Sequence, residues 1–210
     1  MSDLRNSENL TTHSQSAASA ELARSPELMS RDDTALLVID VQEKLIPAIN
    51  GSAAIVWNVR RLLAGARTLG LPCFVTEQYP QGLGSTVSDL ALAAPRFAKL
   101  SFSAAGCREC IDYLKQQNVF RVLLCGLETH ICIQQTALDL LSEGWRVYVA
   151  VDAVGSRHAL DHETALRRID ASGGVLTTTE AALFEWCRVA GTAAFKEISK
   201  LAREPRPDIV

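Results

Sequence analysis

The sequence has no apolar run that is long enough to cross a lipid bilayer. Its longest continuous apolar stretches, such as residues 35–39 and 122–125, have the length of a strand, whereas a membrane-spanning helix needs about 20 apolar residues. An excess of positive charge is also absent, because 21 Lys and Arg stand against 24 Asp and Glu and give a formal net charge of −3. Nucleic acid or an anionic lipid surface would therefore find no attractive field. We expect neither a membrane span nor a nucleic-acid partner.

A secretory signal is lacking too, because no hydrophobic segment opens the sequence. We therefore expect a cytoplasmic protein with six reduced cysteines, since a chain of 210 residues has core enough without disulfide bonds. Residues 1–31 are rich in Ser, Ala, Thr and Asn, and they carry acidic residues, which argues against an acid-poor transit peptide. We therefore predict a flexible N-terminal leader over residues 1–31, one domain over 32–203 and a C-terminal tail over 204–210.

Signatures of nucleotide and zinc binding are missing as well. The glycines at 82 and 84 lack a third glycine at the dinucleotide-binding spacing, and no P-loop occurs. His158 and His162 stand four residues apart but without the glutamate of the HExxH motif, so we expect them to be solvated or structural. The sequence implies no cofactor.

From residue 34 onward, strand-length apolar runs alternate regularly with longer stretches of helical period. The predicted strands are 34–41, 73–78, 121–127, 146–151 and 175–178. The predicted helices are 53–69, 107–117, 129–143 and 159–171, with further closing helices over 180–203. The nearly continuous apolar character of the first and third strands is typical of parallel strands that are buried on both faces. We therefore predict an α/β fold with three layers, α/β/α, around an open, mostly parallel twisted sheet of five or six strands in a Rossmann-like order.

Two charged residues interrupt apolar surroundings. Asp40 ends the first predicted strand, where an ionised carboxylate is costly to bury unless a partner compensates it. Lys99 is flanked by apolar residues, whereas lysine normally stays solvated. Each has a structural alternative, because Asp40 is able to cap the following turn and Lys99 is able to reach solvent along its apolar stem. Both are candidates for a site at the carboxyl ends of the strands, where open α/β sheets bind ligands.

Cys132 lies in the first turn of the helix predicted over 129–143. Unpaired backbone N–H groups and the helix dipole favour an anion there, so the sequence predicts a thiol pKa below the ordinary value of about 8.5 and a usable nucleophile. The alternative is an inert core cysteine, since free cysteine is among the most buried residue types. Cys73, Cys125 and Cys187 lie inside predicted strands or a helix, where a packing role suits each of them better.

Three ordered segments carry more information. They are LVIDVQ at 37–42, FAKLSF at 97–102, and GLETHIC at 126–132 followed by Thr136 and Ala137. With these segments the chain resembles the isochorismatase-like cysteine hydrolases over roughly residues 32–190. The resemblance implies the isochorismatase-like fold.

In that family the aspartate, lysine and cysteine of the three segments form a catalytic triad, which implies the triad Asp40, Lys99 and Cys132 here. Asp40 would accept the thiol proton, Lys99 would stabilise both anions, and Cys132 would attack an electrophilic carbon to give a thioester. The family also has a non-proline cis bond in the third segment. This implies a cis Leu127–Glu128 bond and an oxyanion hole made by the amides of Glu128 and Cys132.

Differences from the family's sequence pattern reduce the range of expected substrates. Family nicotinamidases hold a metal through an Asp and two His between the first segment and the lysine, but no histidine lies between Asp40 and Lys99. We therefore expect no metal and no nicotinamidase activity. Members that hydrolyse isochorismate lack the cysteine, so Cys132 favours hydrolysis of a C–N bond in a small amide-like molecule.

The pocket around the triad is expected to draw on four more residues, which are Gln78, Tyr79, Phe102 and Thr129. The segment TEQYPQGLG at 76–84 is similar to the isochorismatase domain-containing subgroup, whose substrates are poorly defined. The family resemblance also implies a homo-oligomer, either a dimer or a larger assembly.

Two other interpretations stay open. In one, the chain is a catalytically silent relative whose fold serves as an oligomeric interaction protein. The other concerns Cys107 and Cys110, whose spacing at the start of a predicted helix is that of a thiol redox pair. A structural zinc site would need four ligands, and the sequence has no second pair at a suitable spacing.

Overall fold

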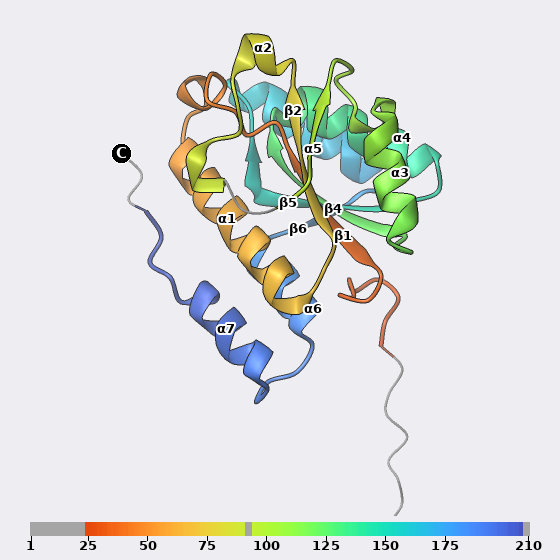
Figure 1. The fold of residues 1–210 in the computed structure, drawn as a ribbon, viewed down its shortest axis with the longest axis vertical. Coiled ribbons are helices and arrows are strands. Elements are labelled where there is room, and N and C mark those ends of the chain that lie inside the picture. The colour runs from red at the N-terminus through yellow and green to blue at the C-terminus, as the bar shows by residue number, and fades with distance from the viewer. Residues whose placement is uncertain (1–23, 91–93, 208–210) are drawn as a thin grey trace, which may run out of the picture.

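Two fully buried strands form the centre of the fold. β1 (Thr34–Ile39) and β4 (Arg121–Leu127) pair in parallel along β1, and every residue of both strands is buried. A strand has this burial pattern when both faces of its sheet are covered. The computed structural model describes residues 24–90 and 94–207, and in it a six-stranded sheet surrounds this pair (Figure 1).

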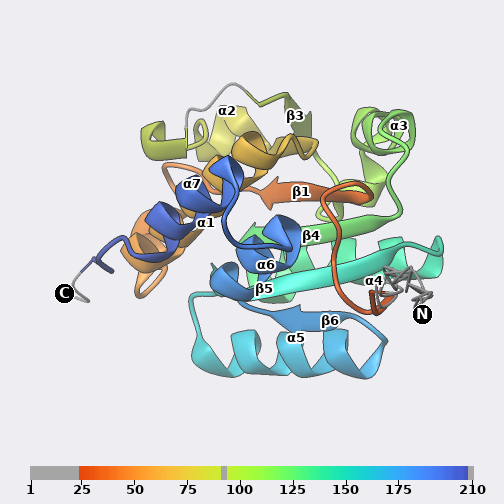
Figure 2. The same ribbon diagram turned by 90° about the horizontal axis from the view of Figure 1, so that it is seen from below.

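The strands follow the order β3-β2-β1-β4-β5-β6, and all neighbours are parallel. β2 (Cys73–Gln78) and β3 (Arg96–Lys99) lie beyond β1, and β5 (Arg146–Gly155) and β6 (Val175–Thr177) lie beyond β4. Figure 2 shows β1, β4, β5 and β6 succeeding one another across the sheet. The predicted α/β fold is confirmed with six strands. The strand order reverses between β1 and β4, which makes this the topological switch point.

Helices cover the two faces of the sheet as separate layers (Figure 1). One layer holds α1 (Ser52–Leu69) and α6 (Thr179–Cys187), with α7 (Ala193–Ala202) packed against both. The other layer holds α3 (Arg108–Gln116), α4 (Gln134–Ser142) and α5 (Ala159–Ala171). The connections contain the short helical turns η1 (Ile46–Ala48), α2 (Pro80–Leu83), η2 (Ser88–Leu90), η3 (Ala104–Gly106) and η4 (Thr129–Ile133).

Three aromatic rings fix α3 over the β2–β3 side of the sheet. The ring of Phe74 on β2 meets Phe97 on β3 and Tyr113 on α3 edge-on, with centroids 5.4 Å apart in both pairs. Such pairs contribute about 0.5–1.5 kcal/mol each beyond the area they bury. The position of α3 matters because the chain between β3 and α3 carries part of the candidate site.

Two local predictions differ from the structure. β3 was not predicted, because an edge strand of four residues with mixed burial has no continuous apolar run to reveal it. The helix predicted over 129–143 is divided, since residues Thr129–Ile133 form a π-helical turn and only Gln134–Ser142 are α-helical.

The domain begins earlier than the predicted boundary at residue 32. Arg24 donates from Nη2 to the carbonyl oxygens of Met29 (3.0 Å) and Glu185 (2.7 Å), and Met29 is fully buried. Tyr148 on β5 donates to the carbonyl oxygen of Glu27 at 2.8 Å. The part of the predicted flexible leader that the structure describes is therefore bound to the domain, while residues 1–23 and 208–210 lie outside the described residues.

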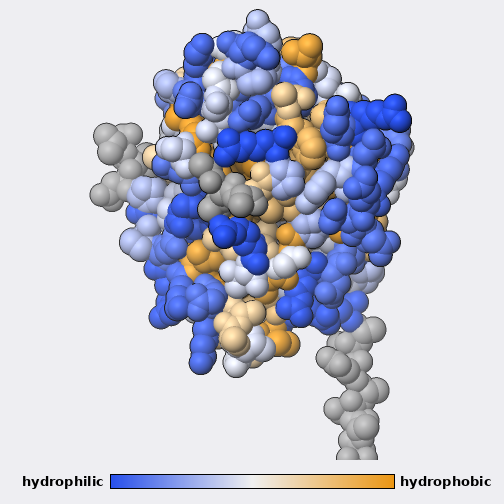
Figure 3. All heavy atoms as spheres, viewed as in Figure 1, coloured by the Kyte–Doolittle hydropathy of each residue, from blue (hydrophilic) through white to orange (hydrophobic). Residues whose placement is uncertain are grey.

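One face of the molecule is mostly polar. On the face in Figure 3, hydrophilic side chains predominate, and apolar ones occupy patches between them. Within residues 24–90 and 94–207, no helix combines the length and the apolar character that crossing a membrane requires.

We predict that Gly126→Ala costs about 3 kcal/mol of unfolding free energy, measured by urea denaturation. Gly126 on β4 has a φ of +115°, and a Cβ there would lie 2.0 Å from the carbonyl oxygen of Ile39, so backbone strain and overpacking add. Gly144→Ala is the matched control, since its φ is +85° but no atom lies within 4 Å of the added carbon; it should cost about 1 kcal/mol. Equal losses in the two variants would contradict the prediction.

Candidate active site

The structure brings the three predicted triad residues to one edge of the sheet. Asp40 directly follows β1, Lys99 ends β3, and Cys132 lies in η4, which follows β4 after one residue. Because the strands are parallel, their carboxyl ends share one edge, which α2 marks in Figure 1. Asp40 and Cys132 therefore lie on either side of the switch point.

A buried ion pair forms the core of this site. Lys99 Nζ lies 2.7 Å from Asp40 Oδ2, and both side chains have an exposed fraction of 0%. Nζ also donates to Gln78 Oε1 (2.7 Å) and to the carbonyl oxygen of Phe102 (3.0 Å). The alternative in which Lys99 reaches solvent is therefore wrong. A buried ion pair of this kind stabilises only when its remaining donors and acceptors are also satisfied.

The second carboxylate oxygen of Asp40 is also satisfied. Thr76 on β2 donates from Oγ1 to Asp40 Oδ1 at 2.8 Å, and its carbonyl oxygen accepts the Asp40 N–H at 3.1 Å. The carboxylate thus accepts from two side chains of the site rather than capping the next turn. Asp40 has a φ of +51°, a conformation that few non-glycine residues adopt.

Two glutamines help to hold Lys99 in position, Gln78 directly and Gln42 through the backbone of Gln78. Gln42 accepts the Gln78 N–H at 2.8 Å and donates to the Gln78 carbonyl oxygen at 3.0 Å, so it holds the end of β2. The side-chain amide of Gln78 is shared between Lys99 and the carbonyl oxygen of Leu100 (2.8 Å). Gln78, expected to contact substrate, therefore supports Lys99. Sequence reasoning missed the roles of Gln42 and Thr76, although both are polar residues in buried surroundings.

The Cys132 thiol is neutral in the resting site. Burial raises its pKa to about 12, the charge of Asp40 adds to the rise, and the charge of Lys99 opposes it. Both side chains thus lie close enough to act on the sulfur. The expectation of a lowered pKa is wrong, because desolvation and the Asp40 carboxylate outweigh the ammonium group and the short helical turn.

The turn after β4 has the predicted backbone geometry. The Leu127–Glu128 peptide bond is cis. The Glu128 carboxylate accepts hydrogen bonds from the N–H group (3.0 Å) and from Nε (3.2 Å) of Arg157, which follows β5. In the part of the chain that the structure describes, no hydrogen bond uses the N–H group of Glu128.

The other expected pocket residues are divided between the protein interior and its surface. Thr129 is fully buried, and its Oγ1 lies 2.9 Å from His162 Nδ1. Burial lowers the pKa of His162, with the charge of Glu163 opposing. Tyr79 and Phe102 are about half exposed, at 52% and 53%, on the two chain segments that flank Lys99. Thr129 thus links the third segment to α5, and the two aromatic side chains remain available to a ligand.

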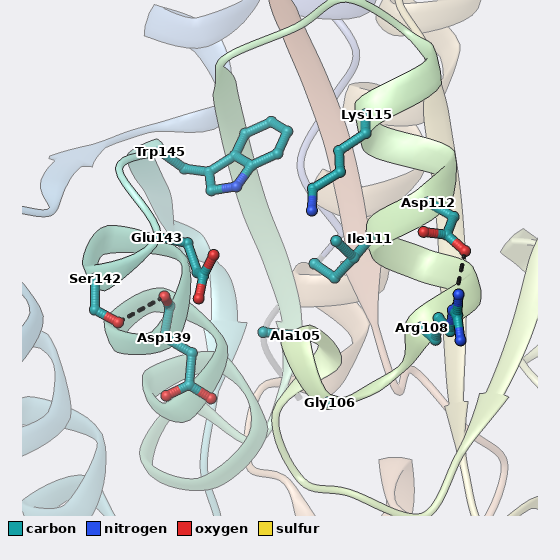
Figure 4. A pocket seen from close by; sticks show the side chains of 10 residues that line it. All are labelled: Ala105, Gly106, Arg108, Ile111, Asp112, Lys115, Asp139, Ser142, Glu143 and Trp145. Carbon is teal, nitrogen blue, oxygen red and sulfur yellow. Dashed lines mark hydrogen bonds and ion pairs between the residues drawn. The ribbon is translucent and has the colours of Figure 1, made fainter.

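Another cavity lies away from these residues. A groove of about 640 Å³ runs between α3 and α4, with Arg108 and Lys115 on one wall and Asp139 and Trp145 on the other (Figure 4). None of the predicted site residues lines it. Among residues 24–90 and 94–207, no three His, Cys, Asp or Glu side chains gather as metal ligands would.

Comparison with known proteins identifies the family. Residues 34–181 match the isochorismatase domain family. The chain is 41% identical to isochorismatase domain-containing protein 2A of Mus musculus over 194 residues, which cover 91% of each chain. The chain therefore belongs to the isochorismatase family.

Solved structures show the same fold. A structure described as MAR1 ribonuclease from Caenorhabditis elegans aligns with a TM-score of 0.81 and 39% identity, covering 87% of this chain and 95% of that one. The YcaC gene product of Escherichia coli, described as an octameric hydrolase of unknown specificity, aligns with a TM-score of 0.79 and 22% identity, covering 85% and 92%.

We predict that Asp40→Asn makes Cys132 more reactive toward iodoacetamide. The thiolate is the species that reacts. Its pKa of about 12 keeps the wild-type rate rising beyond pH 10, whereas removal of the Asp40 charge lowers that pKa and leaves Lys99 free to pair with sulfur. One unit of pKa gives about a tenfold gain in rate at pH 8. Peptide mass spectrometry resolves the sites, and alkylation of Cys73 should stay unchanged. An unchanged or slower Cys132 would contradict the prediction.

A double-mutant cycle tests the ion pair. Lys99→Met leaves the Asp40 carboxylate buried without its cation and should lower the unfolding free energy by about 3–5 kcal/mol. Adding Asp40→Asn removes that charge and keeps an acceptor for Thr76, so it should recover more than half of the loss. Urea denaturation of the wild type, both single variants and the double variant gives the coupling. Additive losses would show that the pair contributes nothing.

Proposed function

We propose that this protein is a metal-independent cysteine hydrolase that cleaves a C–N bond of a small amide-like molecule through Cys132, Asp40 and Lys99. The observation that carries the proposal is the buried Lys99–Asp40 ion pair beside a neutral thiol at the switch point of the sheet. A lysine and an aspartate with no exposed surface are costly to keep. Nucleophilic attack by the adjacent Cys132 sulfur would explain why these two buried charges are present.

The net charge of the three groups stays zero during nucleophilic attack. In the resting site a carboxylate, an ammonium group and a neutral thiol lie together. When Cys132 attacks, its proton moves to Asp40, so the negative charge passes from oxygen to sulfur while Lys99 stays positive. A buried site favours such a transfer, because no step leaves an uncompensated charge in a medium of low dielectric constant. The raised thiol pKa is consistent with a proton that leaves only as the new bond forms.

The acyl transfer then proceeds in two halves. The Cys132 sulfur bonds to the carbonyl carbon, the protonated Asp40 gives its proton to the leaving nitrogen, and a thioester remains on Cys132. Water next attacks the thioester, Asp40 accepts the water proton, and the acid product leaves as the thiol is restored. Lys99 balances the anion in both halves.

The oxyanion is proposed to bind the backbone N–H groups of Glu128 and Cys132. The Glu128 N–H has no hydrogen-bond partner in the described residues, so it is free to donate to an oxyanion. The Glu128 carboxylate is bound by Arg157. Donors of this type contribute about 100- to 1000-fold in rate.

The expected substrate is small and partly apolar. Tyr79 and Phe102 are exposed on the segments that flank Lys99, and a cavity of about 380 Å³ lies beside Lys99, Tyr79 and Leu100. We propose that these side chains contact the substrate, that Gln78 and Thr129 shape its pocket, and that the enzyme is a cytoplasmic homo-oligomer that needs neither metal nor cofactor.

The test is hydrolysis of a panel of small amides by metal-free protein, with Cys132→Ala and Cys73→Ser as the matched pair. Cys132→Ala should lower the rate at least about 1000-fold, because it removes the nucleophile, whereas the half-buried Cys73 at the start of β2 should be replaceable with little loss. Mass spectrometry of a quenched reaction should find the acyl group on the peptide that contains Cys132.

An RNA oligonucleotide belongs in the same panel, because one relative is described as a ribonuclease. The net charge of −3 gives no field that would attract it. Cleavage of RNA with no amide turned over, or amide hydrolysis that survives Cys132→Ala, would overturn the proposal.

A further inference from the structure

Two thiols that the proposed chemistry does not use face each other at the start of α3. Cys107 is the N-cap residue of this helix, with φ −94° and ψ 107°, and Cys110 is its third residue. Residues three positions apart are neighbours on the surface of a helical turn. Both cysteines are free and buried, with exposed fractions of 5% and 1%.

The two thiols lie close enough to affect each other. Burial raises the pKa of the Cys110 thiol, and a hydrogen bond with Cys107 adds to the rise. Cys107 Sγ also donates to Glu109 Oε2 at 3.6 Å, on the first turn of α3. A disulfide needs Cβ atoms about 3.5–4.5 Å apart, and two neighbouring thiols within one helical turn come close to that arrangement.

We propose that Cys107 and Cys110 form a dithiol–disulfide site that exchanges with small disulfides such as oxidised glutathione. Cys107 is the attacking sulfur, because the free N–H groups of the first turn of α3 stabilise a negative charge at the N-cap. Cys110, which lies deeper, is the resolving sulfur. None of the other four cysteines has a partner within three residues in the sequence.

The exchange balances without a further reagent. Cys107 loses its proton and attacks one sulfur of oxidised glutathione, which breaks the glutathione S–S bond and releases one glutathione thiol. Cys110 then loses its proton and attacks Cys107 Sγ, which forms the intramolecular disulfide and releases the second glutathione thiol. The protein loses two electrons and two protons, and one oxidised glutathione becomes two reduced molecules.

The surface beside Cys107 is accessible. Gly106 and Arg108, its neighbours in the chain, line the groove between α3 and α4 (Figure 4). The groove volume of about 640 Å³ is large enough for a peptide-sized reagent. Lys115 and Glu143 line it as well, so both signs of charge are present for a zwitterionic peptide.

The segment between Lys99 and Cys107 is short and is held by several internal hydrogen bonds. Lys99 Nζ donates to the carbonyl oxygens of Ser101 (3.3 Å) and Phe102 (3.0 Å), and Ser101 Oγ donates to the Ser103 carbonyl oxygen at 2.9 Å. The Cys107 N–H donates to the Ala104 carbonyl oxygen at 3.0 Å. Closing the disulfide pulls on the turn that holds Lys99, so oxidation should change the reactivity of Cys132. This consequence, unlike the disulfide itself, rests on the proposed function.

The test incubates the full chain in mixtures of reduced and oxidised glutathione, quenches with acid and N-ethylmaleimide, and maps each cysteine by peptide mass spectrometry. With rising oxidised glutathione, the peptide that holds Cys107 and Cys110 should change from doubly alkylated to the unalkylated disulfide, and reduced glutathione should reverse this. Cys125 and Cys187 should remain thiols throughout.

Two variants separate the roles of the sulfurs. Cys110→Ser should retain one glutathione on Cys107, whereas Cys107→Ser should acquire neither glutathione nor a disulfide at Cys110. The titration of the wild-type protein does not depend on these variants, so the test remains valid if a variant is unstable. The proposal is overturned if both thiols stay alkylatable in oxidised glutathione alone, or if their disulfide forms only as circular dichroism reports unfolding.

The link to the catalytic site has its own readout. Iodoacetamide alkylation of Cys132 should differ at least about twofold between reduced and oxidised wild type, and it should not differ in Cys107→Ser treated in the same way. A disulfide that forms with no change at Cys132 would overturn the link and support the exchange site alone. Because no substrate is turned over in this experiment, its outcome is distinct from that of the amide panel.

Discussion

The ion pair between Lys99 and Asp40 is the interaction on which the rest of the site depends. It is fully buried, and neighbouring polar groups satisfy its remaining donors and acceptors: Thr76 donates to the second oxygen of Asp40, and Gln78 accepts from Lys99. Gln42 in turn fixes the end of β2 that carries Gln78. Burial is the main cause of the raised pKa of the Cys132 thiol, and the charge of Asp40 adds to the rise. The two charges of the pair thus act both on each other and on the sulfur.

The sequence predicted the fold well, because buried parallel strands have an unmistakable pattern. The apolar runs that became β1 and β4 have every residue buried, and Asp40 at the end of the first run pointed to a site at the carboxyl ends of the strands. A charge that interrupts an apolar strand is informative because its burial is costly. The resemblance to a known family then placed Lys99 and Cys132 beside Asp40, which spacing alone would not have done.

The features that could not be predicted from the sequence depend mostly on contacts between segments that lie far apart in the chain. β3 is too short and too exposed to show a pattern, and its position depends on pairing with β2. The pKa of Cys132 depends on desolvation, and no local rule reports how deeply a turn will be buried. Gln42 and Thr76 carried a weak signal as polar residues in apolar surroundings, but their partners lie on other strands.

The position of Lys99 has a consequence for the edge of the sheet. β3 is an edge strand of four residues, and its last residue is the lysine that Asp40 holds from the far side of β2. The buried ammonium group therefore also ties the outermost strand to β1 across β2, in addition to the ladder with β2 and the contact of Phe97 with Phe74. Without β3, the backbone of β2 would become the edge of the sheet, and such an edge readily pairs with other chains. The buried ion pair thus helps to keep β2 covered.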